Sequence, residues 1–324
     1  MNMKAKIVSL CVAVVAGITM LNAQSGTCGA NATWDLSDGV LTIRGTGEME
    51  ADPSYERLTF YRSFITSVII DEGITGICEY AFFECANLTS VTIPNSVTTI
   101  GEAAFRKCAA LTSVTIPSSV TSIGEDAFLE CTGLTSVTIP ESVISLGERA
   151  FALCKNLHAV TFPNGITSVG LDAFGNSGLA SPVYNGHVFA YLPEKYSGDF
   201  TIPEGIQTIA RGAFSNCMHL TSVTIPGSVT TIGENAFWGC DSLSSISIPS
   251  GVTSIGEYAF FNCENITSVT CFAPTPPALG IHPLFGEALF PATATLYVPK
   301  GSVKAYKKSA WKKQFKHIQE MQEQ

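Results

Sequence analysis

Apolar positions recur along this chain with a period of 23 residues. One unit covers residues 111–133 and reads LTSVTIPSSVTSIGEDAFLECTG. A phenylalanine near the end of each unit marks the period, and it is found at Phe82, Phe105, Phe128, Phe151, Phe174, Phe214, Phe237 and Phe260. A fixed period in the twenties is typical of a solenoid, in which coils that cannot bury their apolar side chains alone stack into one core.

Within a unit, the pattern predicts two short extended segments and a tight corner. Val114 and Ile116 alternate with polar residues at the two-residue period of a strand, so they should face the core. Pro117 ends this strand because it has no N–H to donate. Gly124 should allow the corner, and the residues after it should form a single helical turn. The fold class is therefore a mostly β repeat solenoid of 23-residue coils with irregular caps at both ends.

The ends of the chain depart from the repeat, which covers residues 65–271. Residues 24–64 predict an N-terminal cap, because the first coil needs an atypical unit over its open apolar face. Two short strands should meet there at an Asp38-Gly39 turn. One face of that hairpin would be formed by Trp34, Leu36, Val40 and Ile43.

One interval between phenylalanines is irregular, since 40 residues separate Phe174 from Phe214. We expect an insertion there, at about residues 179–200. It is rich in aromatic and imidazole side chains, namely Tyr184, His187, Phe189, Tyr191 and Tyr196. It is interpreted either as a hairpin looped out onto the side of the solenoid or as a binding site whose aromatic residues contact a sugar or a partner.

Residues 272–324 predict a C-terminal cap with a basic helix. Ser302 should cap a helix from Val303 to about Glu323 that buries Tyr306 and Trp311. Seven lysines lie between Lys300 and the end, and the net charge of this stretch is +5. They either keep an end of the array soluble or anchor acidic polysaccharide, lipid headgroups or a negatively charged partner.

Residues 1–23 predict a secretory signal peptide. Lys4 and Lys6 precede an apolar run from Ile7 to Leu21, and small Ala23 precedes the expected cleavage site. No later apolar run is long enough to span a bilayer, so we expect no transmembrane segment in the mature chain. The protein is expected to be secreted or held at the cell surface, or to lie in the periplasm.

The net charge excludes one class of partner. The formal charge of the whole chain is -9, and residues 24–299 carry about -16 once the basic ends are set aside. Such an acidic molecule is not expected to bind nucleic acid.

The repeated pattern LxSVxIPxSVxxIGxxAFxxC resembles the BspA-like leucine-rich repeat family of bacterial cell-surface and secreted proteins. The likeness extends to both flanks, SGTCGANATWDLSDGVLTIRGTGEM and TLYVPKGSVKAYKKSAWKKQFKHI. It implies a solenoid of the leucine-rich-repeat type. Members of the family are associated with adhesion to host proteins or to other cells, so the resemblance also implies a binding role.

Seven cysteines occupy one repeat position, three residues after the phenylalanine: Cys85, Cys108, Cys131, Cys154, Cys217, Cys240 and Cys263. Ser177 stands at that position in the fifth unit. Stacked coils should turn these residues into an internal ladder, in which cysteine acts as a small buried hydrophobe. We favour free thiols over disulfides or a metal site, because pairing an odd number would break the repeat symmetry.

A column of glutamates follows the corner glycine: Glu79, Glu102, Glu125, Glu148, Glu234 and Glu257. We favour stabilisation of a helix start over a calcium site, because the chain has no Asp-rich calcium loop. The sequence also lacks the motifs of hydrolases, zinc peptidases and nucleotide-binding enzymes. We therefore expect no catalytic residue, no metal and no cofactor.

The candidate binding residues lie in a column of hydroxyl side chains and in the irregular interval. The column includes Thr112, Ser113, Thr115, Thr135, Ser136 and Thr138, which should form a regular polar strand surface. The other candidates are His158, Tyr184, His187 and Tyr191. The alternative for the column is an ordinary solvated β face, since threonine is favoured in strands.

These observations predict a non-enzymatic binding protein, an adhesin or host-interaction factor that contacts a host or bacterial surface protein through its repeat face. A glycan-binding module for polysaccharide capture is one alternative. A structural protein of the cell envelope is another.

Overall fold

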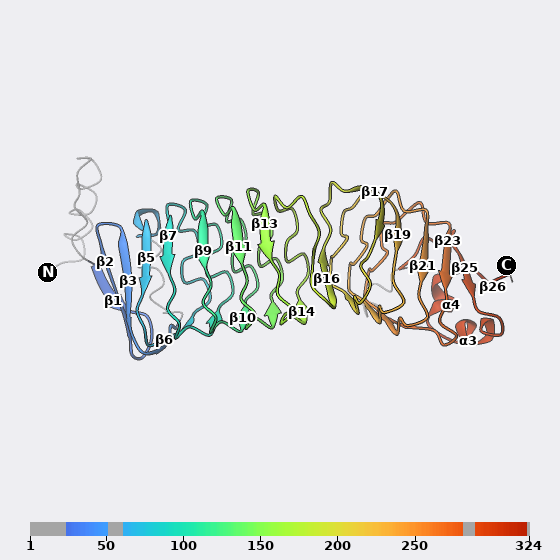
Figure 1. Ribbon diagram of the computed structural model, residues 1–324, viewed down its shortest axis with the longest axis horizontal. Helices are drawn as coiled ribbons and strands as arrows, with labels where there is room; N and C mark the ends of the chain where they lie inside the picture. The colour runs from blue at the N-terminus through green and yellow to red at the C-terminus, as the bar shows by residue number, and fades with distance from the viewer. Residues whose placement is uncertain (1–23, 51–60, 281–288, 323–324) are drawn as a thin grey trace, which may run out of the picture.

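The computed structural model describes residues 24–50, 61–280 and 289–322. These residues form one elongated solenoid, with the N-terminal cap at one end and the C-terminal cap at the other (Figure 1). The predicted repeat solenoid is therefore confirmed. The predicted signal peptide, residues 1–23, lies outside the described residues.

The first strand of each coil stacks in parallel on the first strand of a neighbouring coil. Ser136 pairs with Ser113 on one side and with Ala159 on the other, one repeat away in each direction. The β-branched valine and threonine that fill these positions favour extended backbone. These strands are β5 (Ser67–Ile70), β7 (Ser90–Thr92), β9 (Ser113–Thr115), β11 (Ser136–Thr138), β13 (Ala159–Thr161), β17 (Ser197–Thr201), β19 (His219–Thr224), β21 (Ser245–Ile248), β23 (Ser268–Cys271) and β25 (Thr295–Val298).

A second short strand in each coil builds two further sheets, and the second of these sheets begins within the irregular interval. The first sheet contains β4 (Gly47–Glu48), β6 (Ile74–Ile77), β8 (Thr99–Ile100), β10 (Ser122–Ile123), β12 (Ser145–Leu146) and β14 (Ser168–Val169). The second contains β15 (Val183–Tyr184), β16 (Val188–Tyr191), β18 (Thr208–Ile209), β20 (Thr231–Ile232), β22 (Ser254–Ile255) and β24 (Ala278–Leu279).

The core is organised by the phenylalanines that mark the repeat. Phe128 is fully buried, and its ring stacks on Phe105 at 5.2 Å and on Phe151 at 5.1 Å between ring centroids. The same stacking continues after the irregular interval, where Phe237 and Phe260 lie 5.1 Å apart. Each ring thus shields its neighbours, and no single coil buries its own phenylalanine.

The corner glycine serves close stacking of the coils. A side chain placed on Gly124 would lie 2.7 Å from the backbone of Gly101 in the preceding coil, and one on Gly147 would lie 2.3 Å from Glu125 N. Gly124 does not have a positive φ. The expected reason, freedom to make a tight corner, is therefore replaced by a lack of room for a Cβ atom.

The segment after the glycine is not the helical turn that the pattern predicts. Asp126 and Glu130 have φ of 55° and 60°, in the left-handed region. The N–H groups of Asp126 and Phe128 donate to the carbonyls of Glu148 and Ala150 in the next coil, each at 2.8 Å. These amides bond between coils because stacking places carbonyls opposite them, so no helix begins at the glutamate column.

The cysteine ladder is buried, and its thiols bond along the array. Cys131 Sγ donates to the Phe105 carbonyl at 3.0 Å, and Cys154 Sγ donates to the Phe128 carbonyl at 3.1 Å. The seven ladder cysteines are unpaired, as expected. A thiol is thus small enough for the core and also supplies a donor to a carbonyl of the preceding coil.

Burial should make the ladder thiols unreactive. Desolvation raises the pKa of Cys85, Cys154 and Cys217 to about 12, so almost no thiolate is present at pH 8. We expect a thiol-specific reagent to modify the ladder of the native protein at least ~100-fold more slowly than that of the unreduced protein in denaturant. Missing thiols after denaturation would instead reveal disulfides.

The N-terminal cap is a three-stranded unit joined to the array. β2 (Ala32–Ser37) and β3 (Val40–Gly45) pair around Asp38 and Gly39, which have φ of 50° and 81°, as the predicted hairpin requires. β1 (Gln24–Thr27) pairs with β2, and β3 pairs in parallel with β5. Leu41 is buried and Val40 is only partly buried, so the core face of β3 carries Leu41 in place of the predicted Val40.

The predicted insertion at 179–200 is a coil of the solenoid and does not loop out (Figure 1). β15 and β16 do form an antiparallel pair, but β16 also joins β18 in parallel. Val188 pairs with Thr208, only 20 residues later, so this coil is shorter than the regular one. Buried Phe189 stacks on Phe214 at 4.8 Å, because the stacked core needs a ring where the regular phenylalanine is missing.

The long C-terminal helix is a wrong prediction. The segment forms α3 (Val303–Lys307), α4 (Trp311–Gln314) and a last strand, β26 (His317–Glu320), which pairs with β25. Strand pairing with the open edge of β25 satisfies backbone groups that a continuing helix would leave unpaired. Ser302 does not cap α3 with its side chain, which is buried.

Candidate functional site

The six predicted hydroxyl residues lie together on the outer face of β9, β11 and the residues just before them. Thr115 pairs with Thr138 in register, and Ser113 pairs with Ser136. Their neighbours Val114 and Val137 are buried, so the alternation of the strand turns the hydroxyl residues outward. Thr112, Ser113, Thr115, Thr135, Ser136 and Thr138 are all exposed. We call this surface the hydroxyl face.

The hydroxyl face offers donors and acceptors to a partner. Thr135 Oγ1 donates to the Thr112 carbonyl at 3.3 Å, and this bond fixes the first of the three hydroxyls that this coil contributes. Within the described residues, the hydroxyls of Ser136, Thr115 and Thr138 have no protein hydrogen-bond partner. These groups are satisfied by water and can exchange it for a partner's polar groups.

His158 extends the hydroxyl face by one coil. Its N–H donates to the Thr135 carbonyl at 2.9 Å, and its side chain is exposed. Ala159 follows it and pairs with Ser136, so the hydroxyl pattern is interrupted in this coil. The imidazole therefore stands at the edge of the regular hydroxyl surface.

The structure does not bring the other three candidates to this face. Tyr184 and His187 belong to the region of β15 and β16, which is part of a sheet of second strands. Tyr184 is 43% exposed, and His187 Nε2 lies 2.9 Å from the Asn164 carbonyl oxygen. Tyr191 is 4% exposed, so it is a core residue and not a binding residue as predicted. Its position in the shortened coil turns it inward.

Asn185, which the sequence did not single out, holds the shortened coil to the preceding one. It is buried, and its Nδ2 donates to the carbonyls of Pro163 and Ile166 at 2.9 and 3.0 Å. Its Oδ1 accepts the N–H groups of His187 and Val188 at 2.9 and 2.7 Å. In regular coils this position holds a glycine, such as Gly165, or a serine that makes one bond to the preceding coil, as Ser142 does. An asparagine in their place is the one signal that could have pointed to the role of Asn185.

Carboxylates gather beside the same coil. Glu194 Oε1 accepts the Asn176 N–H at 2.5 Å, where regular coils use a backbone carbonyl. Burial raises the pKa of Asp172 to about 6, and the charges of Glu194 and Glu148 add to the rise while Arg149 opposes it. The ionised form of Asp172 is thus disfavoured in the folded protein.

Replacing Asp172 with asparagine should stabilise the protein at pH 7.5. Because the folded pKa is raised from 3.8 to about 6, charged Asp172 penalises folding above pH 6, and the penalty fades as the pH falls from 6 toward 4. We expect Asp172→Asn to gain on the order of 1–2 kcal/mol at pH 7.5 and little at pH 4. Denaturant unfolding at both pH values measures this difference, and equal effects would contradict the assignment.

Three glutamates of the column, Glu125, Glu148 and Glu234, form ion pairs with arginines. Arg149 binds Glu125 at 2.8 Å and Asp126 at 2.7 Å. Arg211 stands in the column itself and binds Glu148 at 3.2 Å and Glu234 at 2.7 Å. In the part of the chain that the structure describes, no group of three or more acidic, histidine or cysteine side chains is arranged to hold a metal ion.

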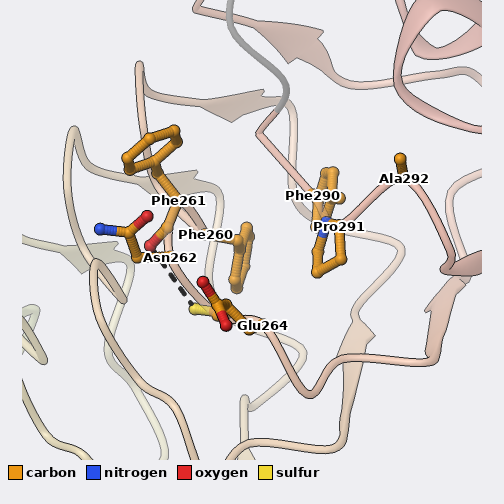
Figure 2. A pocket seen from close by; sticks show the side chains of 8 residues that line it. Phe260, Phe261, Asn262, Glu264, Phe290, Pro291 and Ala292 are labelled. Carbon is orange, nitrogen blue, oxygen red and sulfur yellow. Dashed lines mark hydrogen bonds between the residues drawn. The ribbon is translucent and has the colours of Figure 1, made fainter.

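A hollow of about 390 Å³ lies at the C-terminal end of the array. Figure 2 shows Phe260 facing Phe290 and Pro291, with the Phe261 ring turned away from them. Phe260 and Phe290 are stacked at 4.9 Å, and Asn262 and Glu264 supply the polar part of the lining. None of the candidate binding residues predicted from the sequence lines this hollow.

Comparison with known proteins confirms the resemblance. The model of the BspA type leucine-rich repeat region matches residues 54–180 and 188–275, in six copies. No curated protein matches the sequence. Leucine-rich repeat regions of this type are typically non-catalytic, and they support an interaction role for a repeat protein.

Several solved leucine-rich repeat structures resemble the chain, and two of them illustrate the likeness. A leucine-rich repeat protein from Eubacterium ventriosum is 24% identical, with a TM-score of 0.60 over 92% of this chain and 85% of that one. A leucine rich cell surface protein from Faecalibacterium prausnitzii is 26% identical, with a TM-score of 0.42 over 93% of this chain and 96% of that one. The first likeness confirms the fold, and neither identifies a ligand for this chain.

Proposed function

The chain belongs to the BspA-type leucine-rich repeat family, and from this premise we propose that it is a non-enzymatic adhesin that binds a surface protein of a host or of another bacterium. The observation that carries the proposal is the hydroxyl face. Its exposed hydroxyls repeat in register along β9 and β11, and most have no partner within the described residues.

The repeat supplies affinity through many weak contacts. One coil offers the hydroxyls of residues such as Thr115 and Ser113. Each hydrogen bond from them to a partner contributes only about 0.5–1.5 kcal/mol. Neighbouring rungs are held on one rigid array, so later contacts form without the full entropic cost of association. An extended surface or sheet edge of a partner protein would match this spacing.

The proposed location is the cell surface or the exterior of the cell. It rests on the predicted signal peptide and on the family, whose known members include surface and secreted proteins. Among the described residues, no helix has the length and apolar character to span a membrane.

A glycan-binding role is the second candidate, and exposed Tyr184 supports it. The ring stacks on Phe189 at 5.9 Å, and His187 lies three residues away. A fixed, exposed aromatic ring can stack on one face of a sugar, and polar groups near it in the chain, such as the imidazole, can bond the sugar hydroxyls. Tyr191 is buried and takes no part.

A side-by-side binding screen separates these functions. Residues 24–324 would be tested against extracellular-matrix proteins and against a glycan array. Saturable binding to a protein without glycan binding is expected. Glycan binding that is lost in Tyr184→Ala would favour the second candidate, and an absence of any binding partner in either screen would count against both.

A further inference from the structure

Six exposed lysines lie at the C-terminal end of the array. They lie on α3, on α4 and just after each helix, at Lys304, Lys307, Lys308, Lys312, Lys313 and Lys316. We call them the lysine surface. Tyr306 and Trp311 from the same segment are fully buried, so the lysines stand on a fixed base. Figure 1 shows both helices at the end of the array.

The lysine surface is not neutralised by its surroundings. Within the array, Lys107 binds Glu84 at 3.0 Å and Arg106 binds Asp126 at 2.9 Å. None of the six lysines makes an ion pair with any residue that the structure describes. The excess of positive charge at this end is therefore available to a partner.

The positive charge is confined to this end, because the rest of the molecule is acidic. Residues 300–324 carry a net charge of +5, whereas residues 24–299 carry about -16. At physiological salt the Debye length is ~8 Å, so a ligand at the cap is screened from most of the acidic array. An anion would consequently bind at this end and be repelled elsewhere.

The side chains at this end narrow the class of anion. Between residues 300 and 322, no large hydrophobic side chain is exposed, because Tyr306, Trp311 and Phe315 are buried. These residues therefore expose no phenylalanine, tyrosine or tryptophan ring that could stack on bases and no large apolar side chain that could enter a lipid layer. Lysine offers a compact point charge on a flexible stem, which suits carboxylates or sulfates spaced along a polymer.

We propose that the lysine surface binds an anionic polysaccharide that bears carboxylate or sulfate groups. This site is separate from the hydroxyl face and goes beyond protein adhesion. A polymer held at the end of the array leaves the repeat face open, so the protein can attach to a polysaccharide layer and contact a protein partner at the same time.

Binding to purified polymers tests the proposal with the mature chain, residues 24–324. The probes are polygalacturonate, dextran sulfate, neutral dextran and vesicles that contain anionic phospholipid. We expect binding to at least one acidic polymer, no binding to neutral dextran, and an affinity that falls as salt rises. Removing three charges by Lys304→Gln, Lys308→Gln and Lys312→Gln should weaken binding about 10- to 100-fold.

A matched variant with Lys107→Gln, Lys155→Gln and Lys195→Gln changes the net charge equally but leaves the lysine surface intact. It should bind the acidic polymer within about threefold of the unmodified protein. The proposal is overturned if neither acidic polymer binds, if both triple variants lose binding alike, or if the vesicles bind more tightly than both polymers. Substitutions on the hydroxyl face should leave polymer binding unchanged, so this test is independent of the adhesin proposal.

Discussion

Gly147→Ala is expected to destabilise the protein by about 3 kcal/mol or more, although it adds a single methyl group. That methyl would lie 2.3 Å from Glu125 N and 2.3 Å from the carbonyl carbon of Gly124. Both atoms belong to the backbone of the preceding coil, which cannot turn aside as a side chain can. The coils must separate. This separation weakens the stacking of the phenylalanine rings and the hydrogen bonds of the cysteine thiols on both sides. Denaturant unfolding monitored by circular dichroism measures the loss.

Gly227→Ala is the matched control. A Cβ on Gly227 has no atom within 4 Å, and this glycine does not have a positive φ. Its substitution should change stability by no more than about 0.5 kcal/mol. Equal effects of the two substitutions would show that the close approach of the coils is not what requires glycine at position 147.

Phe128→Ala is expected to cost about 3–5 kcal/mol. The ring is fully buried between Phe105 and Phe151. Its removal leaves a cavity and takes away one stacking partner from each of these two rings. Because each coil contacts only its neighbours, the damage should be local. Hydrogen exchange would show the greatest loss of protection in the coils on either side of residue 128.

Phe272→Ala makes the same substitution at an exposed site. Phe272 is 47% exposed, so its loss should cost less than about 1 kcal/mol. If Phe128→Ala were equally mild, the stacked rings would not be the source of the array's stability. If its effect spread evenly over the whole chain, the neighbour-by-neighbour view of the solenoid would be contradicted.

The fold was predictable at the repeat positions whose side chain has the same physical role in every coil. The phenylalanine period gives the number of residues per coil, and the alternation around Val114 gives the inward face of the strand. Turn chemistry also sufficed for the hairpin at Asp38 and Gly39. These signals are local or strictly periodic, and stacking preserves them.

The failures occur where contacts between coils override local pattern. Glu125 and Asp126 resemble the start of a helix, but their segment bonds to the next coil through left-handed residues such as Asp126. The apolar residues of the C-terminal segment have helical spacing, yet the end of the segment pairs with the edge of β25 as the strand β26. Neither partner is visible in the sequence of the segment itself.

The residues of the candidate site were predictable where the repeat sets their place, and not where the stacking of one particular coil sets it. The hydroxyl residues could be placed together because they share one repeat position, and Thr115 and Thr138 do pair. Tyr191 could not be placed, since its burial depends on the 20-residue register of the shortened coil. Asn185 was overlooked for the same reason, because its bonds exist only when that coil stacks.

The central claim is that the hydroxyl face contacts a protein partner, and a pair of double variants tests it most directly. Thr115→Lys with Thr138→Lys places two bulky charges on that face. Thr98→Lys with Thr121→Lys places the same charges on exposed threonines near β8 and β10, in a different sheet. With the partner found in the screen, the first variant should lose at least about tenfold in affinity and the second should bind normally. Normal binding by the first variant, or equal loss in both, would contradict the claim.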